Sequence, residues 1–139
     1  MLIQLDKDAF KPVRKWDNDA GWDLLSPLDC VVEPHTQLEL DIGVHFAIPK
    51  GFVGMIKTKS SFIRKHVMTE GVVDSGYCGS VHVFINNMSS NQLIIERGQK
   101  VAQIVFMPIF DVGNMEVFND LDKLHDSGRG SDGFGSTGK

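Results

Sequence analysis

The chain has 139 residues, a hydrophobic content of 42% and a formal net charge of −4, which predicts one domain with a substantial core. The charge is spread without a basic block, and this argues against duplex nucleic acid as the main partner. We find neither an apolar run of about 18 residues nor a charged-then-apolar leader, so we expect no membrane span and no signal peptide.

The cysteines and histidines indicate no metal cage. Cys30 and Cys78 have no zinc-binding spacing, and two free thiols in a reducing cytosol are expected rather than a disulfide. The five histidines include no HxxxH or HExxH pair. Any metal is therefore expected to arrive with a ligand.

Short strands dominate the predicted elements. Polar and apolar residues alternate, or β-branched apolar residues cluster, in four runs at residues 37–42, 52–58, 81–85 and 101–106. Turn-forming residues separate the runs at 33–35, 49–51, 74–76, 86–87 and 97–98. Only residues 61–66 and, more weakly, 120–124 predict helical turns. This pattern is typical of an all-β sandwich, jelly roll or small barrel.

Two segments early in the chain combine strands with polar groups. Asp23 stands at the start of an apolar strand, where an isolated aspartate most commonly caps a turn. Lys57-Thr58-Lys59-Ser60-Ser61 ends a strand and opens a short helix. Ammonium, hydroxyl and free N–H groups at a helix start favour anion binding, although an ordinary serine N-cap explains the same residues.

Residues 71–83 predict a strand, a glycine-bearing turn and a second strand. A plain hairpin is one reading of this segment. In the other, two diverging strands present main-chain groups to a flat heterocycle, with Asp74 and Tyr77 at its edge. Farther along, Gln103 is a polar residue inside an apolar strand, and its amide requires partners in the backbone or in a ligand.

The last eleven residues, 129–139, are rich in glycine. Such a segment cannot bury enough apolar surface to fold alone, so we expect it to be flexible, and a linker or frayed terminus is the commoner reading. Yet Arg129, the hydroxyls, the unhindered N–H groups and the ring of Phe134 suit a phosphorylated, planar ligand.

Taken in order, these five segments resemble the five motifs of the homotrimeric dUTP diphosphatase (dUTPase) family, across residues 20–138. The 71–83 segment and the RG..GFGST tail are the most specific parts. The resemblance implies an antiparallel jelly roll (β-clip-like) with at most one short helix. It divides the chain into a catalytic domain at residues 1–126 and a flexible phosphate-binding arm at residues 127–139.

The resemblance also implies an activity, the Mg²⁺-dependent hydrolysis of dUTP to dUMP and pyrophosphate at sites on subunit boundaries. It makes Asp74 the carboxylate that deprotonates the attacking water, and it places Asp23 near the metal-bound triphosphate through water. The implied uracil and deoxyribose contacts are Val72, Val73, Tyr77, His82 and Phe134. The implied phosphate contacts are Lys59, Ser60, Ser61, Gln103, Arg129, Gly135, Ser136 and Thr137.

Some positions depart from the family pattern. Lys59 stands where arginine is usual, so a bidentate phosphate fork becomes a point charge. Ser61 replaces a common glycine, Trp22 replaces tyrosine and Asp132 replaces glycine. The span between Lys59 and Asp74 is also shorter than in many members of the family.

Other readings remain. A dCTP deaminase-like enzyme shares the fold, but Asp74 and a full closing arm disfavour it. A nucleotide-sensing regulatory protein would bind dUTP and contact a partner protein that the sequence does not reveal. A purely structural jelly roll leaves the tail composition unexplained. For the enzyme, we expect dUTP as ligand, a homotrimer, and the cytoplasm as location, or the host cytoplasm for a viral protein.

Overall fold

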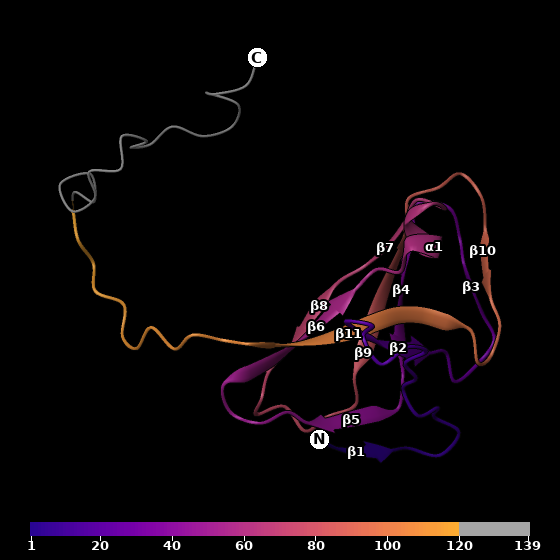
Figure 1. The fold of residues 1–139 in the computed structure, drawn as a ribbon. Coiled ribbons are helices and arrows are strands. Elements are labelled where there is room, and N and C mark those ends of the chain that lie inside the picture. The colour runs from indigo at the N-terminus through magenta and orange to yellow at the C-terminus, as the bar shows by residue number, and fades with distance from the viewer. Residues whose placement is uncertain (120–139) are drawn as a thin grey trace.

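The computed structural model describes residues 1–119, which form short antiparallel strands and one short helix (Figure 1). In chain order the elements are β1 (Leu2–Leu5), β2 (Trp22–Leu25), β3 (Cys30–Val32), β4 (Thr36–Asp41), β5 (Val44–Ala47), β6 (Phe52–Lys57), α1 (Ser60–Ile63), β7 (Val67–Thr69), β8 (Gly71–Val73), β9 (His82–Asn87), β10 (Leu93–Ile95) and β11 (Lys100–Pro108). The predicted antiparallel all-β fold is confirmed. The weak helix candidate at 120–124 lies outside the described residues.

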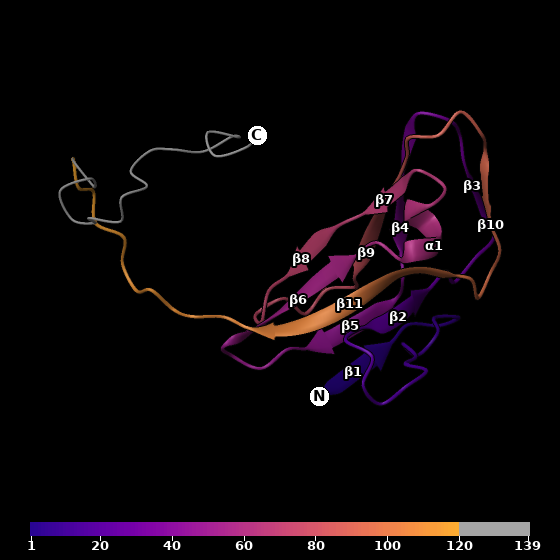
Figure 2. The ribbon, with the colours of Figure 1, turned by 45° about the horizontal axis from the view of Figure 1, so that its top comes forward.

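The strands form four sheets, in the orders β2-β11-β6-β8, β4-β9-β7, β1-β5 and β10-β3. Figure 2 shows the long strand β11 running between β2 and β6. Alternation in β9 sends Val83 and Ile85 into the core and leaves Phe84 exposed. Leu24 of β2 and Ile104 of β11 are fully buried in the same core, which fixes the register of both large sheets.

The turn predicted at Asn86-Asn87 is wrong, because both residues belong to β9. Asn87 is only 1% exposed. Its amide nitrogen donates to the carbonyl oxygens of Val32, Glu33 and Asn91 at 3.0, 3.2 and 2.8 Å. A turn-forming residue here satisfies buried backbone groups at the ends of neighbouring strands.

The predicted helix at 61–66 is shorter in the structure and begins one residue earlier. After Ile63 the chain continues as a turn to His66, whose positive φ of 56° ends the helical path. Phe62 is 2% exposed and anchors the helix to the core.

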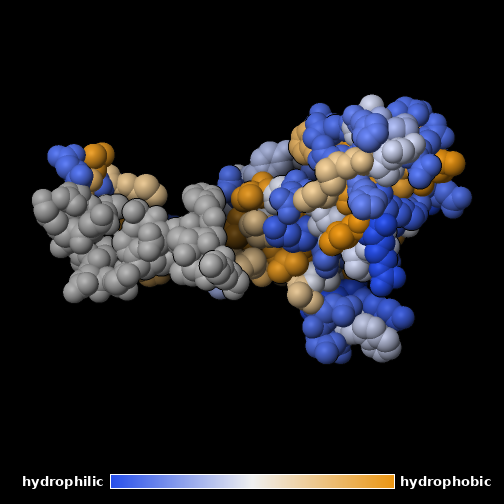
Figure 3. Space-filling model, turned by 90° about the horizontal axis from the view of Figure 1, so that it is seen from above, coloured by the Kyte–Doolittle hydropathy of each residue, from blue (hydrophilic) through white to orange (hydrophobic). Residues whose placement is uncertain are grey.

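Beyond β11 the chain leaves the body of the molecule (Figure 1). Residues 109–119 are all exposed, among them Phe110 (89%), Met115 (88%) and Val117 (96%). Figure 3 shows hydrophobic atoms, in orange, at the far left and apart from the body. The described chain therefore ends in an extended segment whose apolar side chains lack a partner within the body.

The two cysteines do not form a disulfide. Cys30 is half-buried and Cys78 is exposed, and both are free thiols. Within residues 1–119, no helix has the length and apolar character needed to cross a membrane.

Candidate functional site

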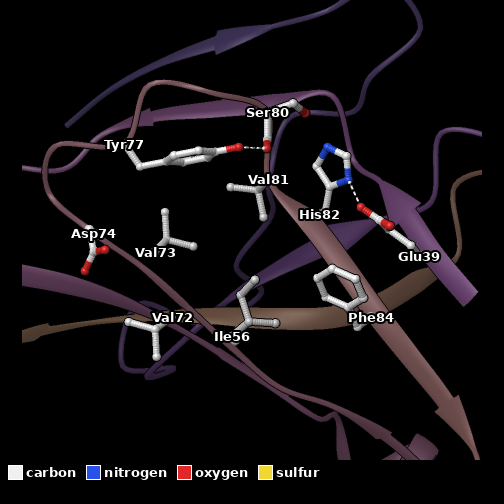
Figure 4. A pocket seen from close by; sticks show the side chains of 11 residues that line it. Glu39, Ile56, Val72, Val73, Asp74, Tyr77, Ser80, Val81, His82 and Phe84 are labelled. Atoms are coloured by element: carbon white, nitrogen blue, oxygen red, sulfur yellow. Dashed lines mark hydrogen bonds and ion pairs between the residues drawn. The ribbon is translucent and has the colours of Figure 1, made fainter. Parts of the chain in front are cut away.

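An open pocket lies between β8 and β9, where the chain passes from one sheet to another (Figure 4). Its lining residues are Glu39, Ile56, Gly71, Val72, Val73, Asp74, Tyr77, Ser80, Val81, His82 and Phe84. We call this the base pocket. Its lining combines aliphatic and aromatic side chains with one aspartate, one glutamate and one histidine.

The two strands that bound the base pocket do not form a hairpin. β8 pairs with β6 at the edge of its sheet, and β9 pairs with β4 and β7 in another. Since β8 is an edge strand, its outer N–H and C=O groups have no strand partner among the described residues. β7 covers only residues 85–87 of β9, which leaves the same side of residues 82–84 without a strand. Two free strand edges can therefore present donors and acceptors to a planar ligand.

Within the loop between these strands, residues 74–80 hold Tyr77 in place. The N–H of Tyr77 donates to the Asp74 carbonyl at 3.1 Å, and its hydroxyl donates to the Ser80 carbonyl at 2.9 Å (Figure 4). A Cβ atom at Gly79 would lie 2.3 Å from that hydroxyl oxygen, so glycine is required for the close approach of the ring. Asp74, exposed at the edge of the pocket, is accessible to water.

Two acidic residues of β4 lie beside His82, and one of them, Glu39, also lines the base pocket. His82 Nδ1 lies 2.8 Å from Glu39 Oε1, and His82 Nε2 lies 3.7 Å from Asp41 Oδ2. Asp41 also accepts hydrogen bonds from the Ser80 hydroxyl and, at 2.9 Å, from the Gly43 N–H. Burial acts to raise the pKa of Asp41, but these hydrogen bonds and the neighbouring histidines outweigh it and hold that pKa below its ordinary value.

A second group of polar residues, which we call the cationic cluster, consists of Asp23, Lys59, Lys100 and Gln103. Asp23 of β2 lies directly opposite Gln103 of β11. Lys59 contacts one oxygen of Asp23, and Lys100 Nζ lies 2.7 Å from the other. Two ammonium groups and one carboxylate leave a net positive charge, which suits a phosphate chain.

The position of Lys100 depends on a β-bulge. The register of β11 against β2 shifts between Lys100 and Ala102, with Val101 as the extra residue. In a regular strand Lys100 and Gln103 would face opposite sides, and the inserted residue turns them to the same side. The bulge therefore brings Lys100 to Asp23.

Asp23 is ionised in this setting. Its side chain is 13% exposed, and burial alone would raise its pKa. Hydrogen bonds and attraction from Lys100 and Lys59 outweigh burial, so the pKa of Asp23 lies below its ordinary value of 3.8.

Backbone and amide groups complete the cluster. Lys59 is the N-cap of α1, and the first N–H bonded inside this turn is that of Phe62, at 2.9 Å from the Lys59 carbonyl. The N–H groups of Ser60 and Ser61 thus have no partner within the helix. Gln103 Nε2 makes one long contact of 3.5 Å with the Thr58 carbonyl, so its amide retains capacity for a ligand.

A family model described as dUTPase matches residues 7–138 of the chain. The chain is also 34% identical over 140 residues to the deoxyuridine 5'-triphosphate nucleotidohydrolase of Tropheryma whipplei (strain Twist), an alignment that covers 97% of this chain and 93% of that protein. The chain belongs to the dUTPase family. The family match and the named relative confirm the sequence-based predictions of this family and of dUTP diphosphatase activity.

Solved dUTPases share the fold. The dUTPase of Staphylococcus bacteriophage 80alpha, solved with dUPNHPP, has a TM-score of 0.89 at 28% identity and covers 99% of this chain and 98% of its own. A mutant dUTPase from phage phi11 of S. aureus, with a coordinated structural Mg(II) ion, has a TM-score of 0.77 at 25% identity. That alignment covers 87% of this chain and 99% of the phage protein.

The structure groups the residues implied by the dUTPase motifs into two places. Val72, Val73, Asp74, Tyr77 and His82 all line the base pocket. The cationic cluster gathers Asp23, Lys59 and Gln103, with Ser60 and Ser61 following Lys59 along the chain. None of this second set lines the base pocket. The remaining implied residues, Arg129, Phe134, Gly135, Ser136 and Thr137, lie outside the described residues, as does the predicted domain boundary at 126–127.

Three residues at these places were not identified from the sequence. Glu39 and Asp41 meet His82 only through the β4–β9 register, and Lys100 meets Asp23 only through the bulge. The alternation at 37–42 predicts that Glu39 is on a polar face, but it does not name the partner strand. A pairing between distant segments carries no local sequence signal.

Proposed function

We propose that this dUTPase-family chain hydrolyses dUTP with Asp74 as the general base and the base pocket as the uracil and deoxyribose site. One observation carries the assignment. Five residues singled out by a resemblance in sequence converge on one pocket, from two strands of different sheets and the loop between them. The exposed Asp74 side chain at the edge of that pocket can accept a proton from the attacking water.

Main-chain groups of β8 and of His82 would select the base. Uracil offers acceptor, donor and acceptor along one edge, whereas cytosine reverses two of these. A buried N–H group left facing a donor costs about 1–3 kcal/mol, so two mismatches discriminate strongly. Val72 supports this role, because it belongs to an edge strand whose outer backbone groups are open.

Tyr77 would exclude a ribose 2′-hydroxyl by packing against the sugar. Its hydroxyl is already bound to the Ser80 carbonyl, and its ring lies close against Gly79. A ring fixed in advance leaves little room for an additional hydroxyl group.

The cationic cluster would bind the triphosphate. Lys59, the N–H groups of Ser60 and Ser61, and the Gln103 amide supply charge and donors for phosphate oxygens. We assign closure over the bound nucleotide to Arg129, Phe134, Gly135, Ser136 and Thr137 from their motif alone.

The residues fit Mg²⁺ that arrives with the nucleotide. Among residues 1–119, no three His, Cys, Asp or Glu side chains are placed to hold a metal ion together. Both oxygens of Asp23 contact ammonium groups, which favours a contact through water over direct ligation. Mg²⁺ on the triphosphate would neutralise phosphate oxygens during the reaction.

We also propose a homotrimer in which one chain's base pocket faces the cationic cluster of another. The two places do not share a pocket within one chain, and the apolar side chains of residues 109–119 need a partner. The two free thiols, one of them exposed, support a reducing compartment such as the cytoplasm.

A mixing experiment tests the shared site. Asp74→Asn and Lys59→Glu chains, each inactive alone, are unfolded together and refolded at equal amounts. If each site takes its pocket and its cluster from different chains, about one quarter of the sites regain both intact parts. Activity no higher than the sum of the two separate variants would place the whole site in one chain.

The reaction itself is tested by pyrophosphate release. We expect release from dUTP with Mg²⁺, and much slower release from UTP and from each of the four ordinary deoxynucleoside triphosphates. Ammonia release from dCTP would instead indicate a deaminase. Tight binding of dUTP without pyrophosphate release would indicate a nucleotide sensor.

A further inference from the structure

His45 contacts the loop that carries Asp74 and Tyr77, although it lines no part of the base pocket. It belongs to β5, and its side chain is 21% exposed. Its Nδ1 atom lies 2.9 Å from the carbonyl oxygen of Cys78, and its Nε2 atom lies 3.1 Å from Asp6 Oδ1. The ring thus bridges the end of β1 and the middle of the 74–80 loop.

Both partners of His45 are acceptors. A backbone carbonyl can only accept a hydrogen bond, and the same is true of a carboxylate. Each ring nitrogen must therefore carry a hydrogen for both contacts to be hydrogen bonds, which is true only of the imidazolium form. Neutral histidine keeps one of the two bonds and presents a lone pair to the other oxygen.

The charged groups around His45 favour that form. Asp6 faces it from the end of β1. Asp41, whose Oδ2 also lies 3.7 Å from His82 Nε2, acts on it from the end of β4. The Cys78 carbonyl and then Asp6 raise the pKa of His45 above its ordinary value of 6.5; desolvation opposes this, and Asp41 adds to it.

The segment that His45 holds has few other anchors. Ser80 is tied to Asp41 through its hydroxyl, and Tyr77 is tied to Ser80. Cys78 lies between them in sequence, next to the glycine against which the tyrosine ring packs. Freeing the Cys78 carbonyl would leave the loop attached at its Ser80 end and at its strand ends.

We propose that protonated His45 is a positioning residue, which fixes the 74–80 loop and hence Tyr77 by tying the Cys78 carbonyl to the Asp6 carboxylate. The inference rests on the proposed function for its effect on catalysis, because it uses the role of Tyr77 in the sugar site. The tie itself is a property of the free protein.

The sign of the pH dependence follows from the protonation state. The raised folded-state pKa means that the tie is fully formed below the ordinary value and is lost as pH rises through the folded-state value. Loss of one hydrogen bond should raise KM for dUTP by about 3- to 10-fold across that transition, with a smaller change in kcat.

Two variants separate this effect from other titrations. His45→Gln carries both of its N–H groups on one nitrogen, which cannot span two oxygens that face different nitrogens of the imidazole ring. Its KM should therefore stay near the high-pH value of the wild type without the transition. Asp6→Asn removes the anion that favours imidazolium, so the transition should move to lower pH while the low-pH KM is kept. Asp8→Asn is the matched control. It removes a nearby carboxylate but keeps the contact with Arg97, which is made by the backbone carbonyl of Asp8.

The test combines kinetics with NMR on the full chain, from about pH 5.5 to about pH 9.5. Tyr77 is the only tyrosine, so ¹³C-labelled tyrosine reports on this ring alone. In the wild type, the ring signals of Tyr77 should shift with pH at the same midpoint as those of the His45 ring. In Asp6→Asn this shared midpoint should lie at lower pH. In His45→Gln the Tyr77 signals should not show this step.

The inference would be overturned if the Tyr77 ring signals and the His45 ring signals changed with pH at different midpoints. It would also be overturned if the midpoint did not move in Asp6→Asn. The NMR result stands apart from the proposed function. A protein that hydrolysed no dUTP but showed the linked titration would refute the proposed function and retain the tie. A protein that hydrolysed dUTP but showed no linked change at Tyr77 would refute the tie and retain the proposed function.

Discussion

The base pocket and the cationic cluster use different physical means to prepare for a ligand. The pocket presents backbone groups at two free strand edges, whose positions are set by ladder hydrogen bonds and by buried residues such as Val73 and Val83. The cluster consists of long charged side chains that already bind each other, with Asp23 between Lys59 and Lys100. Under the proposed function, a nucleobase would enter the pocket without breaking the ladder hydrogen bonds, whereas phosphates would compete with Asp23 for the lysines.

This difference predicts that the pocket sets which nucleotide is selected and that the cluster recognises the charge of the phosphates. Preformed backbone edges reject a wrong base, because they cannot rearrange to satisfy it. Lysine side chains accept any phosphate, and their attraction weakens with salt. Changes in the pocket should therefore alter which nucleotide reacts and how fast, and changes in the cluster should alter how tightly the triphosphate binds.

The largest expected effect comes from Asp74→Asn. We expect kcat to fall by about 100- to 10,000-fold, because the proposed general base is lost. The affinity for dUPNHPP should stay within about twofold of wild type, since the free strand edges remain. Pyrophosphate release and calorimetric titration measure the two quantities. Asp17→Asn, an exposed acid outside the pocket, is the control. Unchanged turnover would remove Asp74 from the role of base.

Lys59→Ala tests the cluster. Losing one charge-assisted hydrogen bond to phosphate should raise KM for dUTP by about 10- to 100-fold and should reduce its dependence on salt. Steady-state kinetics at several salt concentrations measure both effects. Lys57→Ala provides the comparison, because Lys57 Nζ lies 3.5 Å from Glu70 rather than near Asp23. Equal losses in the two variants would argue against a specific phosphate contact.

Gly79→Ala tests the sugar site. The added Cβ would lie 2.3 Å from Tyr77 Oη and 2.5 Å from Cζ, so the ring must move. We expect the preference for dUTP over UTP, as a ratio of kcat/KM values, to fall by about tenfold. Gly76→Ala in the same loop should have little effect, because a Cβ there meets no described atom within 4 Å. A retained preference in Gly79→Ala would show that Tyr77 does not exclude the 2′-hydroxyl.

The smallest effect concerns Asp23 and pH. Because the folded-state pKa of Asp23 is lowered, its contribution to stability is present above its ordinary value of 3.8 and is lost as pH falls through the folded-state value. Urea unfolding from about pH 5 down to about pH 2 should show a shallower loss of stability in Asp23→Asn than in wild type. Asp17→Asn should follow the wild type. Identical slopes for all three proteins would mean that Asp23 is not held ionised by the lysines.

Sequence patterns located the longer strands and β8, but missed three other strands of the same short length as β8. The runs predicted at 37–42, 52–58 and 101–106 correspond to β4, β6 and β11 with shifted ends. By contrast, β3, β7 and β10 have three residues each, too few to display a period of two. Their existence depends on the longer strands beside which they lie, as β7 depends on β9.

Asn87 shows a second limit. Asparagine pairs are typical of turns, yet this residue belongs to β9, where its amide binds the ends of neighbouring segments. The carbonyl of Val32 that it binds is 55 positions away. A local propensity cannot register a partner so distant in sequence.

The sequence by itself determined that the chain is all-β and that Asp74 and Tyr77 share one loop, because these depend on short-range alternation and on one contiguous segment. Its motifs also carried the resemblance to the dUTPase family, which implied the antiparallel jelly roll. Tertiary structure alone decided that residues 71–83 diverge into two sheets instead of forming a hairpin. It also decided that a bulge brings Lys100 to Asp23 and that His45 reaches the Cys78 carbonyl. The reason is that strand register and close contacts between distant segments are set by packing of the whole core, which no local stretch of sequence encodes.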